Sequence, residues 1–278
     1  MPPVDHVRAP AKLTRRLRVV GVRPDGYHLL EAEMATVDLA DELEIEAGTD
    51  GLEVLEAVSW VLDRGPLSTG RRPGGVTAAP AAVPLGSENL VSRALAAVDR
   101  RARVRLLKRI PAGAGLGGGS ADAAAVLRWA GVLDPAVAAR LGADVPFCVV
   151  GGRALVTGVG EVVEPLDFEA FTAVLVTPEL TVPTPEVYRA WDALGGPVGE
   201  HGNDLEPAAV VVEPQLRWWR DMIAAVAGSE PLLAGSGGTW YLEREPEAAG
   251  RLAVELQGAV RAEARQALVV AVSSTAHL

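Results

Sequence analysis

A glycine-rich run, KRIPAGAGLGGGSADAAAVL at residues 108–127, has the composition of a loop that binds an anion and then opens a helix. Successive backbone N–H groups of such a turn form a concave anion site, and a helix starting directly afterwards adds free N–H groups and its positive dipole end. Glycine permits close approach of a ligand, whereas alanine favours immediate helix formation. The residues expected to hold phosphate are Pro111, Ala112, Gly113, Ala114, Gly115, Leu116, Gly117, Gly118, Gly119, Ser120 and Ala121.

The glycine spacing alone leaves the ligand open. Gly113, Gly115 and Gly118 satisfy the pattern GxGxxG, which also occurs in dinucleotide-binding turns. That interpretation needs an acidic residue about twenty positions further on, after a strand, and the nearest one, Asp134, is predicted at the start of a helix. The Walker A pattern GxxxxGK[ST] does not occur. A tight strand-to-helix turn without a ligand is the remaining alternative.

The strand predicted upstream of this loop, over residues 11–20, would present one polar and one apolar face. Its side chains alternate in character, as they do in a half-buried strand. The expected apolar face carries Leu13, Leu17 and Val19, and the expected polar face carries Lys12, Thr14, Arg16 and Arg18. Arg15 would lie on the apolar face, and the pattern offers no explanation for it.

The remaining pattern alternates strands and helices, which predicts an α/β (α+β) fold. Before residue 167 we expect strands at 35–47 and 103–110, helices at 87–102 (capped by Ser87), 118–129 and 134–142, and a hairpin over 154–166. After it we expect strands at 172–178 and 266–274, helices at 184–194, 214–228 and 245–258, and a glycine turn at 234–238. We therefore predict domains at 1–167 and 168–278, with residues 64–86, rich in Gly and Pro, forming a surface segment.

Composition excludes several classes of protein. The chain has 278 residues, 49% of them hydrophobic, a formal net charge of −10 and no long Lys/Arg tract, so we do not expect it to bind nucleic acid. Its single cysteine, Cys148, rules out an internal disulfide framework. The sequence contains neither an apolar signal segment at its start nor a run of eighteen apolar residues, so we expect a cytoplasmic protein without membrane contact.

The run at 111–127 resembles the phosphate loop of the GHMP kinases, a superfamily of small-molecule kinases. Segments matching one branch of that superfamily occur in the same order: APAKL (9–13), RPDGYHLL (23–30), ENLVSRA (88–94), LGADVPF (141–147), PTPEVY (183–188) and AGSGG (234–238). The resemblance implies an N-terminal ATP-binding domain similar to ribosomal protein S5 and a ferredoxin-like C-terminal domain. It implies transfer of a phosphoryl group from ATP, with Mg²⁺, to the 2-hydroxyl of a methylerythritol carrying a cytidyl diphosphate, in the non-mevalonate isoprenoid pathway. The expected partners are these small molecules, and the expected state is a monomer or homodimer.

The same resemblance implies roles for individual residues. Lys12 would lie at the transferred phosphate and Asp144 would act as the catalytic base. His28 would read the cytosine, with Tyr27 beside it, and Tyr188 would stack on the ring. Each of these could instead be structural: a solvated lysine, a turn aspartate, a packed histidine or a core tyrosine.

Nucleotide contacts are implied for two further residues. Asn89 would lie near the base of the nucleotide, unless it only begins a helix. Ser120 would touch phosphate or a water bound to Mg²⁺. The resemblance assigns no protein side chain as a metal ligand.

Three positions depart from the branch pattern. Position 14 is Thr where an Asn is usual, which retains a hydroxyl but loses an amide, and Thr14 is still expected to contact substrate. Arg15 and Arg16 replace apolar or aromatic residues, and Arg16 could assist a diphosphate. These departures leave open a GHMP kinase for a different alcohol or a nucleotide-binding protein without catalysis.

Overall fold

The computed structural model describes residues 3–56, 58, 83–276 and 278. The first half of the chain forms β1 (Val4–Val22), β2 (His28–Ala47), β3 (Gly51–Glu56), α1 (Leu90–Ala97), β4 (Ala102–Lys108), α2 (Gly118–Trp129), α3 (Pro135–Leu141), α4 (Val145–Val150), β5 (Arg153–Gly158) and β6 (Val162–Pro165). The second half forms β7 (Thr172–Pro178), α5 (Thr184–Ala193), α6 (Glu206–Val212), α7 (Gln215–Ala227), β8 (Leu232–Leu233), β9 (Trp240–Arg244), α8 (Pro246–Ala262) and β10 (Ala267–Ser273). Residues 64–82 of the predicted surface segment lie outside the described residues.

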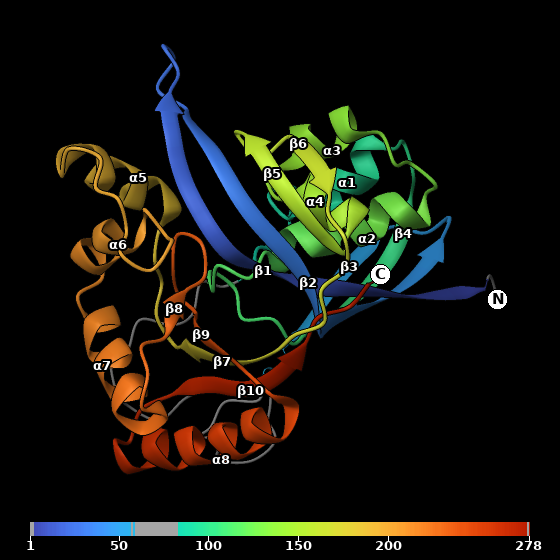
Figure 1. Cartoon of the computed structure of the whole chain (residues 1–278). Coiled ribbons are helices and arrows are strands. Elements are labelled where there is room, and N and C mark those ends of the chain that lie inside the picture. The colour runs from blue at the N-terminus through green and yellow to red at the C-terminus, as the bar shows by residue number, and fades with distance from the viewer. Residues whose placement is uncertain (1–2, 57, 59–82, 277) are drawn as a thin grey trace.

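The first sheet is built around the long strand β2. Its strands follow the order β3-β4-β2-β5-β6, and β1 pairs with the other edge of β2. All of these pairs are antiparallel except β3 with β4, whose parallel arrangement is made possible by the intervening helix α1. Helices α1 to α4 gather on one face of this sheet (Figure 1). The apolar side chains of α2 are buried in the core of this layer, so the glycine loop that precedes α2 rests on packed structure.

The second sheet has the ferredoxin-like arrangement that the resemblance implied. Its strand order is β10-β7-β9-β8, with every pair antiparallel. The elements follow one another as strand, helices, strand, strand, helix, strand, which is the βαββαβ pattern of that fold. Figure 1 shows α8 lying along this sheet, where it contacts β7, β9 and β10.

The chain changes from the first sheet to the second between Pro165 and Thr172, which brackets the predicted boundary at 167. The division into two domains stays a prediction, because apolar packing and backbone bridges join the two parts. One buried cluster contains residues from both halves, and isolated bridges pair Leu17 with Asn203 and Val37 with Ser274. Among the described residues, no helix has both the length and the apolar character needed to cross a membrane.

The predicted faces of the first strand are wrong beyond residue 14, because β1 contains bulges. Thr14 pairs with Met34 and Arg16 with Glu33, so two steps along β1 correspond to one along β2. Paired residues share a face and consecutive residues alternate, so Arg16 faces away from Thr14. The same shift separates Leu13 from Leu17, which lie in different apolar clusters.

Two further local predictions need correction. The cap of α1 is Asn89 and not Ser87, because the Asn89 side chain accepts a hydrogen bond from the backbone N–H of Val91. Five short elements, β3, α4, α6, β8 and β9, were not anticipated. Each has two to seven residues, which is too short to show a clear periodicity.

Candidate active site

The glycine loop connects the end of β4 to the start of α2, as its composition predicts. Helix α2 begins at Gly118, directly after Gly117, whose φ of 69° is in the left-handed region that glycine tolerates. The loop lines a cavity of about 370 Å³ together with Asn89, Lys108 and Asp122. Every residue of the predicted phosphate site from Pro111 to Ser120, apart from the buried Leu116, lines this cavity.

A second glycine turn, Ala234 to Gly238, touches the first through its backbone. A β-carbon built on Gly115 would lie 2.6 Å from the carbonyl oxygen of Gly237 and 2.9 Å from that of Ala234. The hydroxyl of Thr239 donates to the carbonyl oxygen of Ala114 at 2.7 Å. Two segments more than a hundred residues apart therefore hold each other in place, and glycine at position 115 is required by the close approach.

Lys12 lies where these two turns meet. Its backbone N–H donates to the carbonyl oxygen of Leu116 at 3.0 Å, and its stem passes Gly117 so closely that a β-carbon there would lie 2.8 Å from Lys12 Cγ. The residue is 5% exposed. Its Nζ donates to Thr14 Oγ1 at 3.0 Å and lies 3.4 Å from Asp144 Oδ2. The structure thus brings Lys12, Thr14 and Asp144 together beneath the glycine loop.

Asp144 precedes α4 but does not serve as a side-chain cap. Within the described residues its carboxylate makes no capping hydrogen bond, and the side chain is 32% exposed. A carboxylate that is partly accessible and beside a buried ammonium can accept a proton from a bound ligand. The Asp144 carboxylate thus has no capping role among the described residues, whereas Asp134, at the start of α3, accepts a hydrogen bond from Ala136 N as a cap.

The sequence interpretation missed a buried charge cluster below the loop. Lys108 Nζ donates to Asp41 and, at 2.8 Å, to Asp122 Oδ2. Asp41 Oδ1 also accepts the backbone N–H groups of Arg109 and Ile110, at 2.5 and 2.8 Å. Asp41 thus holds the backbone of the residues directly before the glycine loop. Lys108 links these residues to α2, the helix that follows the loop. The sequence offered only weak signals, a Lys-Arg pair before the loop and an aspartate at the fifth position of the helix after it.

The charges in this cluster are unbalanced, which affects ionisation. Burial, together with the negative charge of Asp41, raises the pKa of Asp122 to about 7, although Lys108 opposes this. Burial alone would lower the pKa of Lys108, yet the two carboxylates raise it. Asp122 Oδ1 is buried and has no hydrogen-bond partner among the described residues. One proton on Asp122 therefore makes the cluster neutral.

We predict that Asp122→Asn changes the pH dependence of stability. Asp122 ionises near its ordinary pKa in the unfolded chain but only near 7 in the folded one, so raising the pH across this interval favours unfolding of the wild type. The Asn variant lacks this contribution. In urea titrations from pH 4 to 7, the variant should gain stability relative to the wild type by on the order of 1 kcal/mol per pH unit. Parallel pH profiles would contradict the assignment.

A third group of side chains surrounds His28 at the start of β2. Its ring lies 4.7 Å from that of Tyr188, tilted by 31°, and 5.5 Å from that of Trp191, edge to face. Its Nε2 lies 2.8 Å from Asp192 Oδ1. Burial raises the pKa of Tyr188, as does the nearby negative charge of Asp144. Figure 1 shows α5, which carries these partners, beside the β1–β2 hairpin.

Two predicted residues have structural partners of their own. Tyr27 is 63% exposed, and its ring centre lies 5.7 Å from the Arg23 guanidinium. Asn89 uses its Oδ1 to cap α1 and donates through Nδ2 to the carbonyl oxygen of Pro84 at 2.7 Å. It lines the cavity while serving mainly as a structural residue.

Asn203 is a positioning residue that the sequence interpretation also missed. It donates to the carbonyl oxygens of Leu233 and Gly235, at 2.8 and 2.7 Å, and accepts from Leu205 N. It therefore fixes the second glycine turn, whose Gly235 faces Lys12 and Thr14. An Asn-Asp pair directly before a short helix resembles an ordinary cap, so the sequence carried no distinctive signal.

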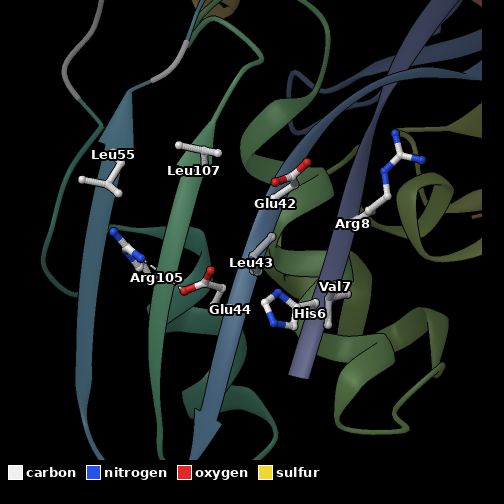
Figure 2. Close-up of a pocket in the computed structure, with 9 residues that line it drawn as sticks. All are labelled: His6, Val7, Arg8, Glu42, Leu43, Glu44, Leu55, Arg105 and Leu107. Carbon is white, nitrogen blue, oxygen red and sulfur yellow. Dashed lines mark hydrogen bonds and ion pairs between the residues drawn. The ribbon is translucent and has the colours of Figure 1, made fainter. Parts of the chain in front are cut away.

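The open face of the first sheet holds another hollow, of about 410 Å³ (Figure 2). It contains none of the predicted site residues. Its charged side chains pair across strands, with Arg105 lying 3.5 Å from Glu44 and 3.6 Å from Glu53. Exposed cross-strand pairs of this kind are typical of a solvated sheet face. We therefore place the candidate active site at the glycine loops.

Comparison with known proteins identifies the family. The family model described as GHMP kinases N terminal domain matches residues 89–152, which include α1 and the glycine loop. A relative from Cereibacter sphaeroides, named 4-diphosphocytidyl-2-C-methyl-D-erythritol kinase, is 36% identical over an alignment 281 residues long, which covers 90% of this chain and 93% of the relative. The chain belongs to the 4-diphosphocytidyl-2-C-methyl-D-erythritol kinase family.

Solved structures agree with this membership. A crystal structure of 4-(cytidine 5'-diphospho)-2C-methyl-D-erythritol kinase matches with a TM-score of 0.70 at 35% identity, covering 97% of this kinase and 99% of that chain. Homoserine kinase from Cytophaga hutchinsonii matches with a TM-score of 0.57 at 18% identity, covering 98% and 95%, and this likeness concerns the fold alone. The protein is a small-molecule kinase that uses ATP and has the GHMP kinase fold. The dinucleotide-binding and the non-catalytic alternatives are therefore set aside.

Proposed function

We propose that this kinase transfers the γ-phosphoryl group of ATP to the 2-hydroxyl of 4-diphosphocytidyl-2-C-methyl-D-erythritol, a step of non-mevalonate isoprenoid biosynthesis. The name of its relatives supports this substrate. The observation that carries the proposal is the approach of Lys12 Nζ to Asp144 Oδ2, at 3.4 Å beneath the two glycine turns. A base and a cation next to the proposed phosphate loop support a phosphoryl transfer there.

Each partner in the transfer has a proposed role. Asp144 accepts the proton of the substrate hydroxyl while the hydroxyl oxygen attacks the γ-phosphorus. The bond between the γ-phosphorus and the bridging oxygen of ADP breaks. The Lys12 ammonium offsets negative charge on the moving phosphoryl group. Backbone N–H groups of the loop and of the first turn of α2 hold the remaining phosphates. Thr14, which accepts from Lys12 Nζ, keeps that ammonium aimed at the site.

The site also fits a nucleotide with Mg²⁺. The Ser120 hydroxyl lies at the start of α2 and lines the cavity, so it could contact phosphate or a metal-bound water. Mg²⁺ needs few protein ligands when phosphates and waters supply the rest. When bound, Mg²⁺ would supply charge neutralisation at the phosphates.

The acceptor would bind between the Lys12–Asp144 pair and α5. His28 and Tyr188 would hold the cytidyl group, His28 by hydrogen bonding and Tyr188 through its ring face. Tyr27, exposed at the hairpin turn, would close over the base. The hydroxyls of Thr184 and Ser236 lie 2.7 Å apart, so the start of α5 is tied to the second glycine turn.

An assay of ATP consumption tests the proposal. We expect turnover with 4-diphosphocytidyl-2-C-methyl-D-erythritol and none above background with homoserine or mevalonate. Product analysis should place the new phosphate on the 2-hydroxyl. Activity with homoserine or mevalonate alone would assign a different GHMP kinase function to the same site.

A further inference from the structure

One face of α5 surrounds the imidazole of His28. Tyr188, Trp191 and Asp192 are three and four residues apart, so they project from the same side of the helix. The two aromatic rings contact the imidazole, and Asp192 Oδ1 lies 2.8 Å from its Nε2. The His28 side chain is 9% exposed, whereas that of Asp192 is 50% exposed. The orientation of this ring is therefore fixed by packing.

The carboxylate of Asp192 determines which nitrogen carries the proton. A carboxylate only accepts hydrogen bonds, so its partner Nε2 must donate. In a neutral imidazole the other nitrogen, Nδ1, is then an acceptor. Within the described part of the chain, no group donates to Nδ1. Nδ1 of His28 is thus an acceptor that no described group of the chain satisfies.

We propose that Asp192 is a positioning residue that selects the base of the substrate by holding His28 as the Nε2–H tautomer. An acceptor at Nδ1 pairs with a base that presents an amino group, as cytosine does at position 4. It is mismatched with uracil, which has a carbonyl oxygen there. This selection rests on the proposed function, because it requires the cytidyl group at His28.

The variant Asp192→Asn tests the selection. Its amide can either accept from or donate to Nε2, so both tautomers become possible without loss of volume. We expect the preference in kcat/KM for the cytidyl substrate over its uridyl analogue to fall about tenfold, the size of one mismatched hydrogen bond. The KM for ATP should not change. Glu186→Gln is the matched control on the same helix, since Glu186 pairs with the exposed Arg189, and it should keep the wild-type preference.

A second measurement reads the tautomer directly. The chain contains four histidines, so ¹⁵N NMR of the ligand-free enzyme, assigned with His28→Asn, should show Nε2 of His28 protonated in the wild type and a mixture in Asp192→Asn. An unchanged base preference in Asp192→Asn, or protonation at Nδ1 in the wild type, would overturn the inference. A wild type inactive on the cytidyl substrate would instead overturn the proposed function, and base selection with it.

Discussion

Asp144→Asn is expected to abolish turnover while ATP still binds. The substitution keeps the shape of the side chain but removes its ability to accept a proton, which lowers kcat by about 10²–10⁴-fold where a general base is lost. The fold should tolerate it, since the Asp144 carboxylate does not cap α4 within the described residues. Lys12 Nζ also retains its hydrogen bond to Thr14. Steady-state assays would give kcat, and calorimetric titration would give the Kd for ATP.

Asp221→Asn provides the control for this experiment. Asp221 is an exposed carboxylate on α7 that pairs with Arg220, away from the glycine turns. Its loss should change neither kcat nor the affinity for ATP, because exposed ion pairs contribute little. If Asp144→Asn retained turnover close to that of Asp221→Asn, Asp144 could not be the base.

Local composition was sufficient to predict the glycine loop. The loop and the start of α2 depend on the conformational preferences of neighbouring residues, and the structure places both where the sequence indicated. The cap at Asp134 and the hairpin of β5 and β6 follow from equally local signals. Matched segments extended this to Lys12, Thr14 and Asp144, which the structure brings together.

Features that depend on distant partners could not be predicted in this way. Arg15 had no explanation in the sequence, because its partners come from three other strands or loops. Its guanidinium lies 2.7 Å from Glu243, 3.0 Å from Glu33 and 3.4 Å from Glu169, so it joins the two sheets. The bulge at Arg15 and Arg16 likewise reflects pairing with β2 and not the alternation within β1.

The buried cluster below the loop illustrates the same limit. Lys108 and Asp122 are fourteen positions apart, and Asp41 is sixty-seven positions from Lys108, so no motif joins them. Charged residues are usually exposed, which made each one look like a solvated side chain. The role of Asp41 becomes visible only in the folded structure, where it accepts hydrogen bonds from the backbone directly before the glycine loop.

Gly115→Ala should destabilise the enzyme far more than Gly113→Ala, and the comparison isolates the contact between the glycine turns. Both residues have positive φ, 76° and 72°, so each alanine pays about 1–2 kcal/mol of backbone strain. A β-carbon at 113 meets nothing within 4 Å, whereas one at 115 overlaps the carbonyl oxygens of Gly237 and Ala234. Because those atoms are backbone, the turns must separate, which adds about 1–3 kcal/mol as overpacking does.

Urea unfolding without nucleotide is the cleanest measurement, since a bound phosphate could itself contact either new methyl group. Gly115→Ala should have the lower free energy of unfolding and should also lose turnover, because the second turn faces Lys12 and Thr14 through Gly235. Equal stability of the two variants would show that the turns adjust freely. In that case the contact between them could not be what fixes Lys12 beside Asp144.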